Sequence, residues 1–151
     1  MTSVMFVCLG NICRSPLAEG IFRHKIRHAG LTSRFRIDSA GTGNWHHGKS
    51  PDPRSIDVAT KYGIDIATQR ARQVTRGDFN AFDIILAMDA DNLATLRRLA
   101  PPTAPARLRL FIETPPQDVP DPYYGGAEGF ETVYRIIEEG CSGLLHELHR
   151  V

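Results

Sequence analysis

The chain has 151 residues, of which 42% are hydrophobic and 23% charged, and its formal net charge is +1. We expect one globular domain over residues 1–151, with a hydrophobic core and, given the balanced charge, no nucleic acid partner. The first apolar stretch, residues 4–9, is too short for a membrane span or a signal-peptide core. We therefore expect a cytoplasmic protein without membrane insertion. The sequence leaves the oligomeric state open, with a monomer as the simplest expectation.

Apolar runs and helical patterns alternate along the chain. The runs predict buried strands at residues 4–9, 35–41, 82–89 and 107–112. The helical patterns predict helices from the turn at Pro16 to Gly30, near residues 54–62, at residues 91–100 and along an apolar stripe from Phe130 to Leu148. A proline-rich loop separates the fourth strand from the last helix. This order predicts an α/β sandwich with a parallel sheet, in which ligands bind beyond the carboxyl ends of the strands.

The chain contains three cysteines, Cys8, Cys13 and Cys141. Their odd number and irregular spacing argue against a disulfide framework and indicate a reducing compartment. No C-x-x-C motif or paired Cys/His spacing predicts a structural zinc site. We expect neither a metal nor an organic cofactor.

A short loop joins the first strand to the first helix and reads CLGNICRS over residues 8–15. The five residues between Cys8 and Arg14 can curl so that their backbone N–H groups form a nest for an oxyanion. Gly10 adopts positive φ freely, and Asn11 tolerates it better than most residues. The helix N-terminus adds positive partial charge, and Arg14 offers a planar fork for two phosphate oxygens. The pattern predicts a phosphate cradle, although not a Walker loop, which ends in Gly-Lys-Ser/Thr.

A thiol at the base of this cradle indicates nucleophilic catalysis. The dipoles that hold a phosphate also stabilise the thiolate form of Cys8, which is the attacking species. Ser15 can donate a hydrogen bond to that sulfur and help it to leave in a second step. Alternatively, Cys8 ends a buried strand as a small hydrophobic residue and Ser15 caps the helix. We favour catalysis because Arg14 and Ser15 follow the cysteine at this spacing.

Cleavage of a phosphate ester also needs a proton for the leaving oxygen and then a base for water. Asp121 is a candidate, because the following Pro122 biases it toward an extended backbone. Taken alone, Asp-Pro more often marks a turn, and Asp118 is a rival acid.

Aromatic residues near these positions predict the walls of a pocket for a flat phenyl ester. Tyr123 follows the candidate acid, and Trp45 lies in the loop after the second strand. Leu9 and Ile12 add apolar contacts, whereas Tyr124 is a weaker candidate.

Four motifs give the chain a resemblance to the low-molecular-weight protein tyrosine phosphatases. They are VCLGNICRSPLAE at residues 7–19, DSAGT at 38–42, SPDPR at 50–54 and DPYYGG at 121–126. The resemblance spans essentially the whole chain and implies a flavodoxin-like three-layer sandwich with a four-stranded parallel sheet flanked by helices. It also implies metal-independent hydrolysis of phosphotyrosine and small aryl phosphate esters through a cysteinyl-phosphate intermediate.

By position, the resemblance makes Cys8 the nucleophile, Arg14 the phosphate clamp and Asp121 the general acid and then base. It implies a partner that is a phosphotyrosine-containing protein. The residues expected to bind substrate or phosphate are Leu9, Gly10, Asn11, Ile12, Cys13, Ser15, Trp45 and Tyr123. Asn11 and Ser39 resemble the polar pair that supports the loop. Gln69 stands where the family often has a histidine, so we assign it no catalytic role.

Three other functions compete with this interpretation. A protein-arginine phosphatase typically has a small hydroxyl residue at the position of Ile12. An arsenate reductase needs further redox cysteines downstream, where only Cys141 is available. A non-catalytic binder of phosphorylated partners would leave Cys8 and Asp121 unexplained. The sequence also suggests that Cys13 forms a reversible disulfide with Cys8 on oxidation, although a packed loop residue explains Cys13 equally well.

Overall fold

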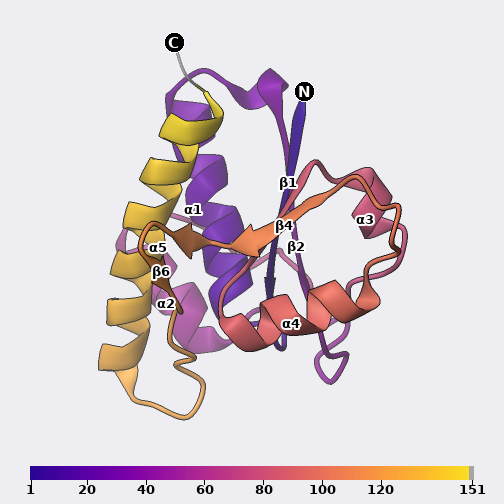
Figure 1. The fold of residues 1–151 in the computed structure, drawn as a ribbon. Coiled ribbons are helices and arrows are strands. Elements are labelled where there is room, and N and C mark those ends of the chain that lie inside the picture. The colour runs from indigo at the N-terminus through magenta and orange to yellow at the C-terminus, as the bar shows by residue number, and fades with distance from the viewer. Residues whose placement is uncertain (150–151) are drawn as a thin grey trace.

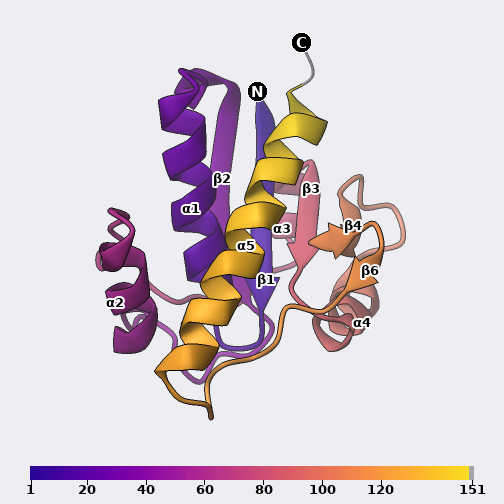
Figure 2. The same ribbon diagram turned by 90° about the vertical axis from the view of Figure 1, so that its left-hand side faces the viewer.

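The computed structural model describes residues 1–149 and contains a parallel sheet with strand order β2-β1-β3-β4. The strands are β1 (Thr2–Cys8), β2 (Phe35–Gly41), β3 (Ile84–Ala87) and β4 (Arg107–Leu110). In the register of β1, Cys8 lies opposite Gly41 of β2 and Val7 opposite Ala87 of β3. The carboxyl ends of these strands therefore meet at one edge of the sheet, at the lower end of β1 and β3 in Figure 2.

Helices cover both faces of the sheet (Figure 1). One face carries α1 (Arg14–His28), α2 (Pro53–Lys61) and α5 (Ala127–Leu148), and the other carries α3 (Asp78–Ala81) and α4 (Ala90–Leu99). Val4, Phe6 and Cys8 of β1 join the core under α1 and α5, whereas Met5 and Val7 join the core on the opposite face. Burial on both faces explains why β1 reads as an unbroken apolar run. The predicted three-layer α/β sandwich is confirmed.

The structure also contains short elements that the sequence did not indicate. A 3₁₀ turn, η1 (Thr32–Arg34), precedes β2, and β5 (Ile112–Glu113) pairs antiparallel with β6 (Pro116–Gln117) inside the predicted proline-rich loop. The third strand is two residues shorter than predicted at each end. The fourth strand ends at Leu110, and Ile112, predicted as its last residue, begins β5 instead.

The glycine at position 140 of α5 has a packing role. A Cβ there would lie 2.6 Å from the ring of Phe111, so only glycine lets the helix approach the sheet this closely. No helix within residues 1–149 is long and apolar enough to cross a membrane.

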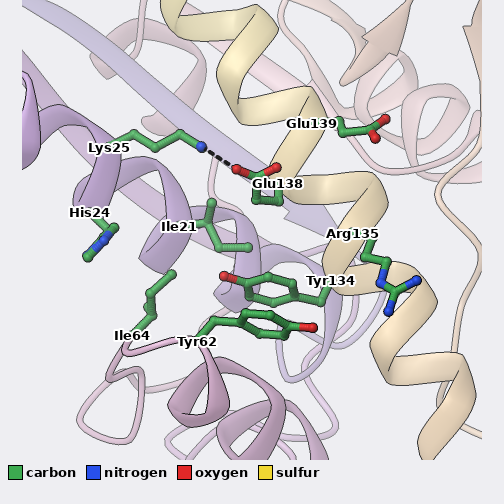
Figure 3. Close-up of a pocket in the computed structure, with 9 residues that line it drawn as sticks. All are labelled: Ile21, His24, Lys25, Tyr62, Ile64, Tyr134, Arg135, Glu138 and Glu139. Carbon is green, nitrogen blue, oxygen red and sulfur yellow. Dashed lines mark hydrogen bonds and ion pairs between the residues drawn. The ribbon is translucent and has the colours of Figure 1, made fainter.

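Side chains of α1, α5 and the segment that follows α2 line a hollow (Figure 3). Tyr62 stacks on Tyr134, with ring centroids 4.3 Å apart, and Lys25 of α1 pairs with Glu138 of α5 at 2.6 Å. The hollow between these side chains has a volume of about 480 Å³. The lining includes two basic residues, Lys25 and Arg135, and two acidic ones, Glu138 and Glu139. The hollow therefore does not present a surface of one charge.

Candidate active site

The loop that follows β1 curls around the sulfur of Cys8. Asn11 has φ 57°, which is the only positive φ at a non-glycine residue among residues 1–149, and its backbone N–H donates to Cys8 Sγ at 3.3 Å. Gly10 does not use its freedom to adopt positive φ. A Cβ at Gly10 would lie 3.0 Å from the ring of His46, so a larger residue here would require that side chain to shift by a few tenths of an ångström. The left-handed turn at Asn11 is therefore what points an amide at the sulfur.

The end of β2 and the two residues that follow it hold this loop in place. Thr42 N–H donates to Cys8 O and Gly43 N–H donates to Leu9 O, both at 2.9 Å. A Cβ on Gly41 would lie 2.8 Å from Leu9 O, so the end of β2 approaches the loop too closely for any other residue. This contact explains the glycine of the DSAGT motif.

Ser15 and Asn11 form a buried polar pair behind the sulfur. Ser15 Oγ lies 3.0 Å from Cys8 Sγ and accepts a hydrogen bond from Asn11 Nδ2 at 2.8 Å. Asn11 Nδ2 also donates to Ser39 Oγ at 3.0 Å, and Asn11 Oδ1 accepts from Arg72 N–H at 3.0 Å, which fixes the orientation of the amide. Asn11 and Ser39, the pair to which the resemblance assigns support of the loop, are therefore hydrogen-bonded to each other.

Glu19 extends this chain of hydrogen bonds, and its second carboxylate oxygen, Oε2, pairs with Arg23 at 3.0 Å. Ser39 Oγ donates to Glu19 Oε1 at 2.7 Å, and burial raises the pKa of the Glu19 carboxyl. The carboxylate can only accept, so Ser39 uses its proton there and must accept from Asn11. The sequence reasoning missed Glu19 and Arg72, although Glu19 lies within the first quoted motif.

Arg14 is the first residue of α1, and its side chain is almost fully buried at the floor of the site. Its NH1 group donates to Asp89 Oδ2 at 2.6 Å and to Val119 O at 2.9 Å, while NH2 lies 3.6 Å from Asp121 Oδ2. Burial opposes the charge, but Cys8, Asp89 and Asp121 outweigh it and raise the pKa of Arg14. The guanidinium therefore stays cationic in a fixed orientation. Sequence reasoning missed Asp89 and Val119 as its partners.

A cavity of about 380 Å³ opens above the sulfur. Its lining brings together most of the residues predicted to bind substrate and adds His46: Cys8, Leu9, Gly10, Ile12, Cys13, Arg14, Trp45, His46, Asp121, Tyr123 and Tyr124. Asn11, Ser15 and Ser39 do not line the cavity and act from behind the loop. Trp45 and Tyr124 are 66% and 95% exposed, so they stand at its rim.

The two candidate acids occupy different environments. Asp121 lines the cavity, and its Oδ1 accepts from Tyr123 N–H at 3.1 Å. Asp118 Oδ1 instead accepts from the N–H of Ala90 at 3.0 Å, at the first turn of α4. The geometry therefore favours Asp121 over Asp118 as a proton donor to a ligand in the cavity.

A second thiol, that of Cys13, also lines the cavity. Burial raises the pKa of the Cys13 thiol to about 12, so this side chain is protonated at neutral pH. Within residues 1–149, no three His, Cys, Asp or Glu side chains lie close enough together to hold a metal ion.

Comparisons with known proteins show which family the chain resembles over its length. Residues 3–151 match the profile of a family described as "Low molecular weight phosphotyrosine protein phosphatase". The chain is 48% identical to the low molecular weight phosphotyrosine protein phosphatase of Schizosaccharomyces pombe, over 87% of this chain and 86% of that protein. It is 46% identical to the low molecular weight protein-tyrosine-phosphatase of Streptomyces coelicolor, over 94% and 90% of the two chains.

Solved structures give the same result at the level of the fold. A protein tyrosine phosphatase from Entamoeba histolytica with Hepes in its active site superposes with a TM-score of 0.92 at 38% identity, covering 98% of this chain and 97% of that one. YfkJ from Bacillus subtilis superposes with a TM-score of 0.91 at 41% identity, covering 98% and 94%.

Proposed function

Since the chain belongs to the low molecular weight phosphotyrosine protein phosphatase family, a family of hydrolases, we propose that it hydrolyses phosphotyrosine and small aryl phosphate monoesters through a phosphoryl group carried on Cys8. One observation carries the proposal. The sulfur of Cys8, the guanidinium of Arg14 and the carboxyl group of Asp121 line a single cavity, although the last is far from the others in the sequence.

In the first step, Cys8 Sγ attacks the phosphorus and the bond to the phenolic oxygen breaks. The electron pair of that bond goes to the oxygen, which takes the proton of Asp121 as it leaves. Arg14 and the converging amides of the loop balance the charge on the phosphoryl oxygens. Two hydrogen bonds, from Asn11 N–H and Ser15 Oγ, stabilise the thiolate before the attack.

In the second step, the carboxylate of Asp121 takes a proton from water, and the water oxygen attacks the phosphorus. The P–S bond breaks and its electrons return to the sulfur. Inorganic phosphate is released, and the thiolate of Cys8 is regenerated. The same hydrogen bonds from Ser15 and Asn11 stabilise the sulfur as a leaving group. The cycle consumes one water and requires no other reactant.

The cavity wall supports an aromatic substrate. Tyr123 and Trp45 offer ring faces to a phenyl group, and Leu9 and Ile12 add apolar surface around the cradle. Ile12 contributes no hydroxyl group to the loop, which supports phosphotyrosine over phosphoarginine as the substrate. The natural partner on this proposal is a protein that carries phosphotyrosine.

The position of Cys141 argues against a thiol-dependent oxyanion reductase. Its sulfur is fully buried in α5, lies 3.7 Å from Ala18 O, and does not line the cavity. Burial also raises the pKa of this thiol, so it is a poor nucleophile. The three cysteines are free thiols in the structure, and a reducing compartment such as the cytoplasm would suit the proposed chemistry.

The experiment that tests the function is turnover of phenyl phosphate in the presence of a chelator, with Cys8→Ser as the comparison. We expect turnover without added metal, inhibition by vanadate and loss of activity in the variant, and acid quenching should trap phosphate on Cys8 of the wild type. Substantial activity in Cys8→Ser would contradict the covalent mechanism. Capture of phosphotyrosine rather than phosphoarginine proteins by Cys8→Ser, scored by mass spectrometry, would separate the two phosphatase functions.

A further inference from the structure

The SPDPR motif at residues 50–54 has no part in the chemistry described above. It nevertheless contacts both the loop around Cys8 and the segment that contains Asp121. Asp52 is the N-cap of α2, and its carboxylate accepts from Arg54 N–H at 2.8 Å. The backbone N–H of Asp52 donates to Ile12 O at 2.8 Å, within the loop that surrounds Cys8. The start of α2 is therefore fastened to the phosphate cradle.

The side chain of Arg54 extends from this point to the segment that follows the proposed acid. Arg54 makes a two-pronged ion pair with Asp52, Nε–Oδ1 at 3.0 Å and NH2–Oδ2 at 2.9 Å. The same guanidinium donates to Tyr123 O at 2.8 Å and to Gly125 O at 3.0 Å. Its central carbon lies 4.5 Å above the ring of Phe130 in the first turn of α5. One planar group thus joins the cradle, the acid segment and α5.

Few other hydrogen bonds hold the acid segment, residues 121–125. Within residues 1–149, the only hydrogen bonds that reach this segment from elsewhere in the chain come from Arg54. On the upstream side, Val119 is anchored by its N–H to Met88 O at 2.7 Å and by its carbonyl to Arg14. The side chain of Asp121 lies between these two anchors and is 41% exposed, and its partners among residues 1–149 are Arg14 and Tyr123 N–H. Its place over the sulfur depends on both ends of the segment being held.

We propose that Arg54 is a positioning residue that holds the carboxyl group of Asp121 over the phosphate cradle. The proposal rests on the function proposed above, because it assigns the purpose of Arg54 to the proton transfer by Asp121. Displacement of a catalytic group by about 1 Å can cost about 10²-fold in rate. Loss of Arg54 should therefore impair reactions that need the proton and spare those that do not.

Two substrates separate these reactions. Phenolate leaving from phenyl phosphate is strongly basic and needs the proton, whereas 4-nitrophenolate is stable as an anion and leaves without it. The variant Arg54→Met keeps an apolar stem over Phe130 and removes every side-chain hydrogen-bond donor at this position. Arg36→Met is the matched control, since Arg36 lies 4.4 Å above the ring of Phe82 and donates to Ala81 O at 3.2 Å, away from the cavity.

We expect Arg54→Met to lower kcat/KM about tenfold or more for phenyl phosphate and less than about threefold for 4-nitrophenyl phosphate. Arg36→Met should change neither value. In the Asp121→Asn background, adding Arg54→Met should not change the ratio of the two substrates further, because the group that it positions is already inactive. If Arg54→Met does not fold, Arg54→Gln, which retains one donor group, takes its place.

Equal losses on both substrates, a full additional loss in the Asp121→Asn background, or no loss at all would each overturn the role of Arg54. These results differ from failure of the proposed function. In that case, wild type itself would not hydrolyse either ester, or Asp121→Asn alone would treat the two substrates alike.

Discussion

The hydroxyl oxygen of Ser15 lies 3.0 Å from the sulfur of Cys8, and both side chains are buried. Asn11 Nδ2 occupies one lone pair of this hydroxyl, and the competing acceptor Ala40 O is farther away, at 3.5 Å. The Ser15 proton is therefore directed at the sulfur. The hydrogen bonds that join Glu19, Ser39, Asn11 and Ser15 therefore fix the orientation of the Ser15 hydroxyl as well as its position.

Replacement of Ser15 by alanine should slow turnover about 10- to 100-fold, because a hydrogen bond to a charged group contributes about 1.5–3 kcal/mol. The leaving sulfur loses a donor, so breakdown of the phosphoenzyme should slow and a burst of phenol should become visible in stopped flow. Ser55→Ala is the matched control, since Ser55 is a buried serine that donates to Cys13 O at 3.5 Å and does not line the cavity. An equal effect of both changes would argue against a specific role for Ser15.

Asp121→Asn should lower kcat/KM for phenyl phosphate about 10²-fold or more and affect 4-nitrophenyl phosphate far less. The amide cannot supply the proton that a basic leaving group requires. Asp118→Asn is the control, because an asparagine oxygen can still accept from Ala90 N–H. If Asp118→Asn produced the same dependence on the leaving group, the assignment of the acid would be wrong.

The parts of the fold that were predicted correctly are those in which local sequence carries the signal. β1 is buried on both faces and reads as an apolar run, and α5 carries a long apolar stripe. The strands β5 and β6 have two residues each, and α3 has four. Elements this short show no hydrophobic period, so the sequence did not indicate them.

The site divides in the same way. The thiol, the amides and the guanidinium between Cys8 and Arg14 come from one continuous loop, and the motif could be interpreted without the fold. Asp89 lies 75 positions from Arg14, and Val119 lies 105 positions away, so their contacts with Arg14 depend on tertiary structure. Arg54 was visible only as part of a motif, because its carbonyl partners in the acid segment have no side-chain signature.

Cys13 and Cys8 line the same cavity, which supports the predicted reversible disulfide. Peroxide would oxidise the Cys8 thiolate to a sulfenic acid, and attack by the Cys13 sulfur would form the S–S bond and release water. Because burial raises the pKa of the Cys13 thiol, this second step should be slow at neutral pH and faster at higher pH. The raised pKa of Cys13 predicts that iodoacetate at neutral pH labels Cys8 first, as mass spectrometry of the peptides can check.

The corresponding functional experiment is recovery of activity by thiol reductant after brief exposure to peroxide. Wild type should recover its activity, whereas Cys13→Ala should stay inactive because its Cys8 has been oxidised irreversibly. Cys141→Ala should behave as wild type, because this sulfur lies in the core and not at the cavity. Equal recovery of wild type and Cys13→Ala would argue against the disulfide.

The raised pKa of Glu19 has a consequence for stability. Burial favours the protonated carboxyl group in the folded protein, so the folded state binds more protons than the unfolded state in the pH range between the two pKa values. The stabilising contribution of this group is complete below the unfolded value near 4.5 and is lost as the pH rises through the folded value. Glu19→Gln, which keeps an oxygen acceptor for Ser39, removes this titration.

We therefore expect Glu19→Gln to gain melting temperature relative to wild type between pH 4 and pH 7, while its kcat stays within about threefold of wild type. Glu19→Met, which has no acceptor, should lose activity in addition, because Ser39 can no longer hold Asn11 in its orientation. Differential scanning calorimetry at the two pH values, together with turnover of phenyl phosphate, measures both effects. A constant difference in melting temperature across this range would contradict the burial effect. Full activity in Glu19→Met would show that the loop does not need an oxygen acceptor at position 19.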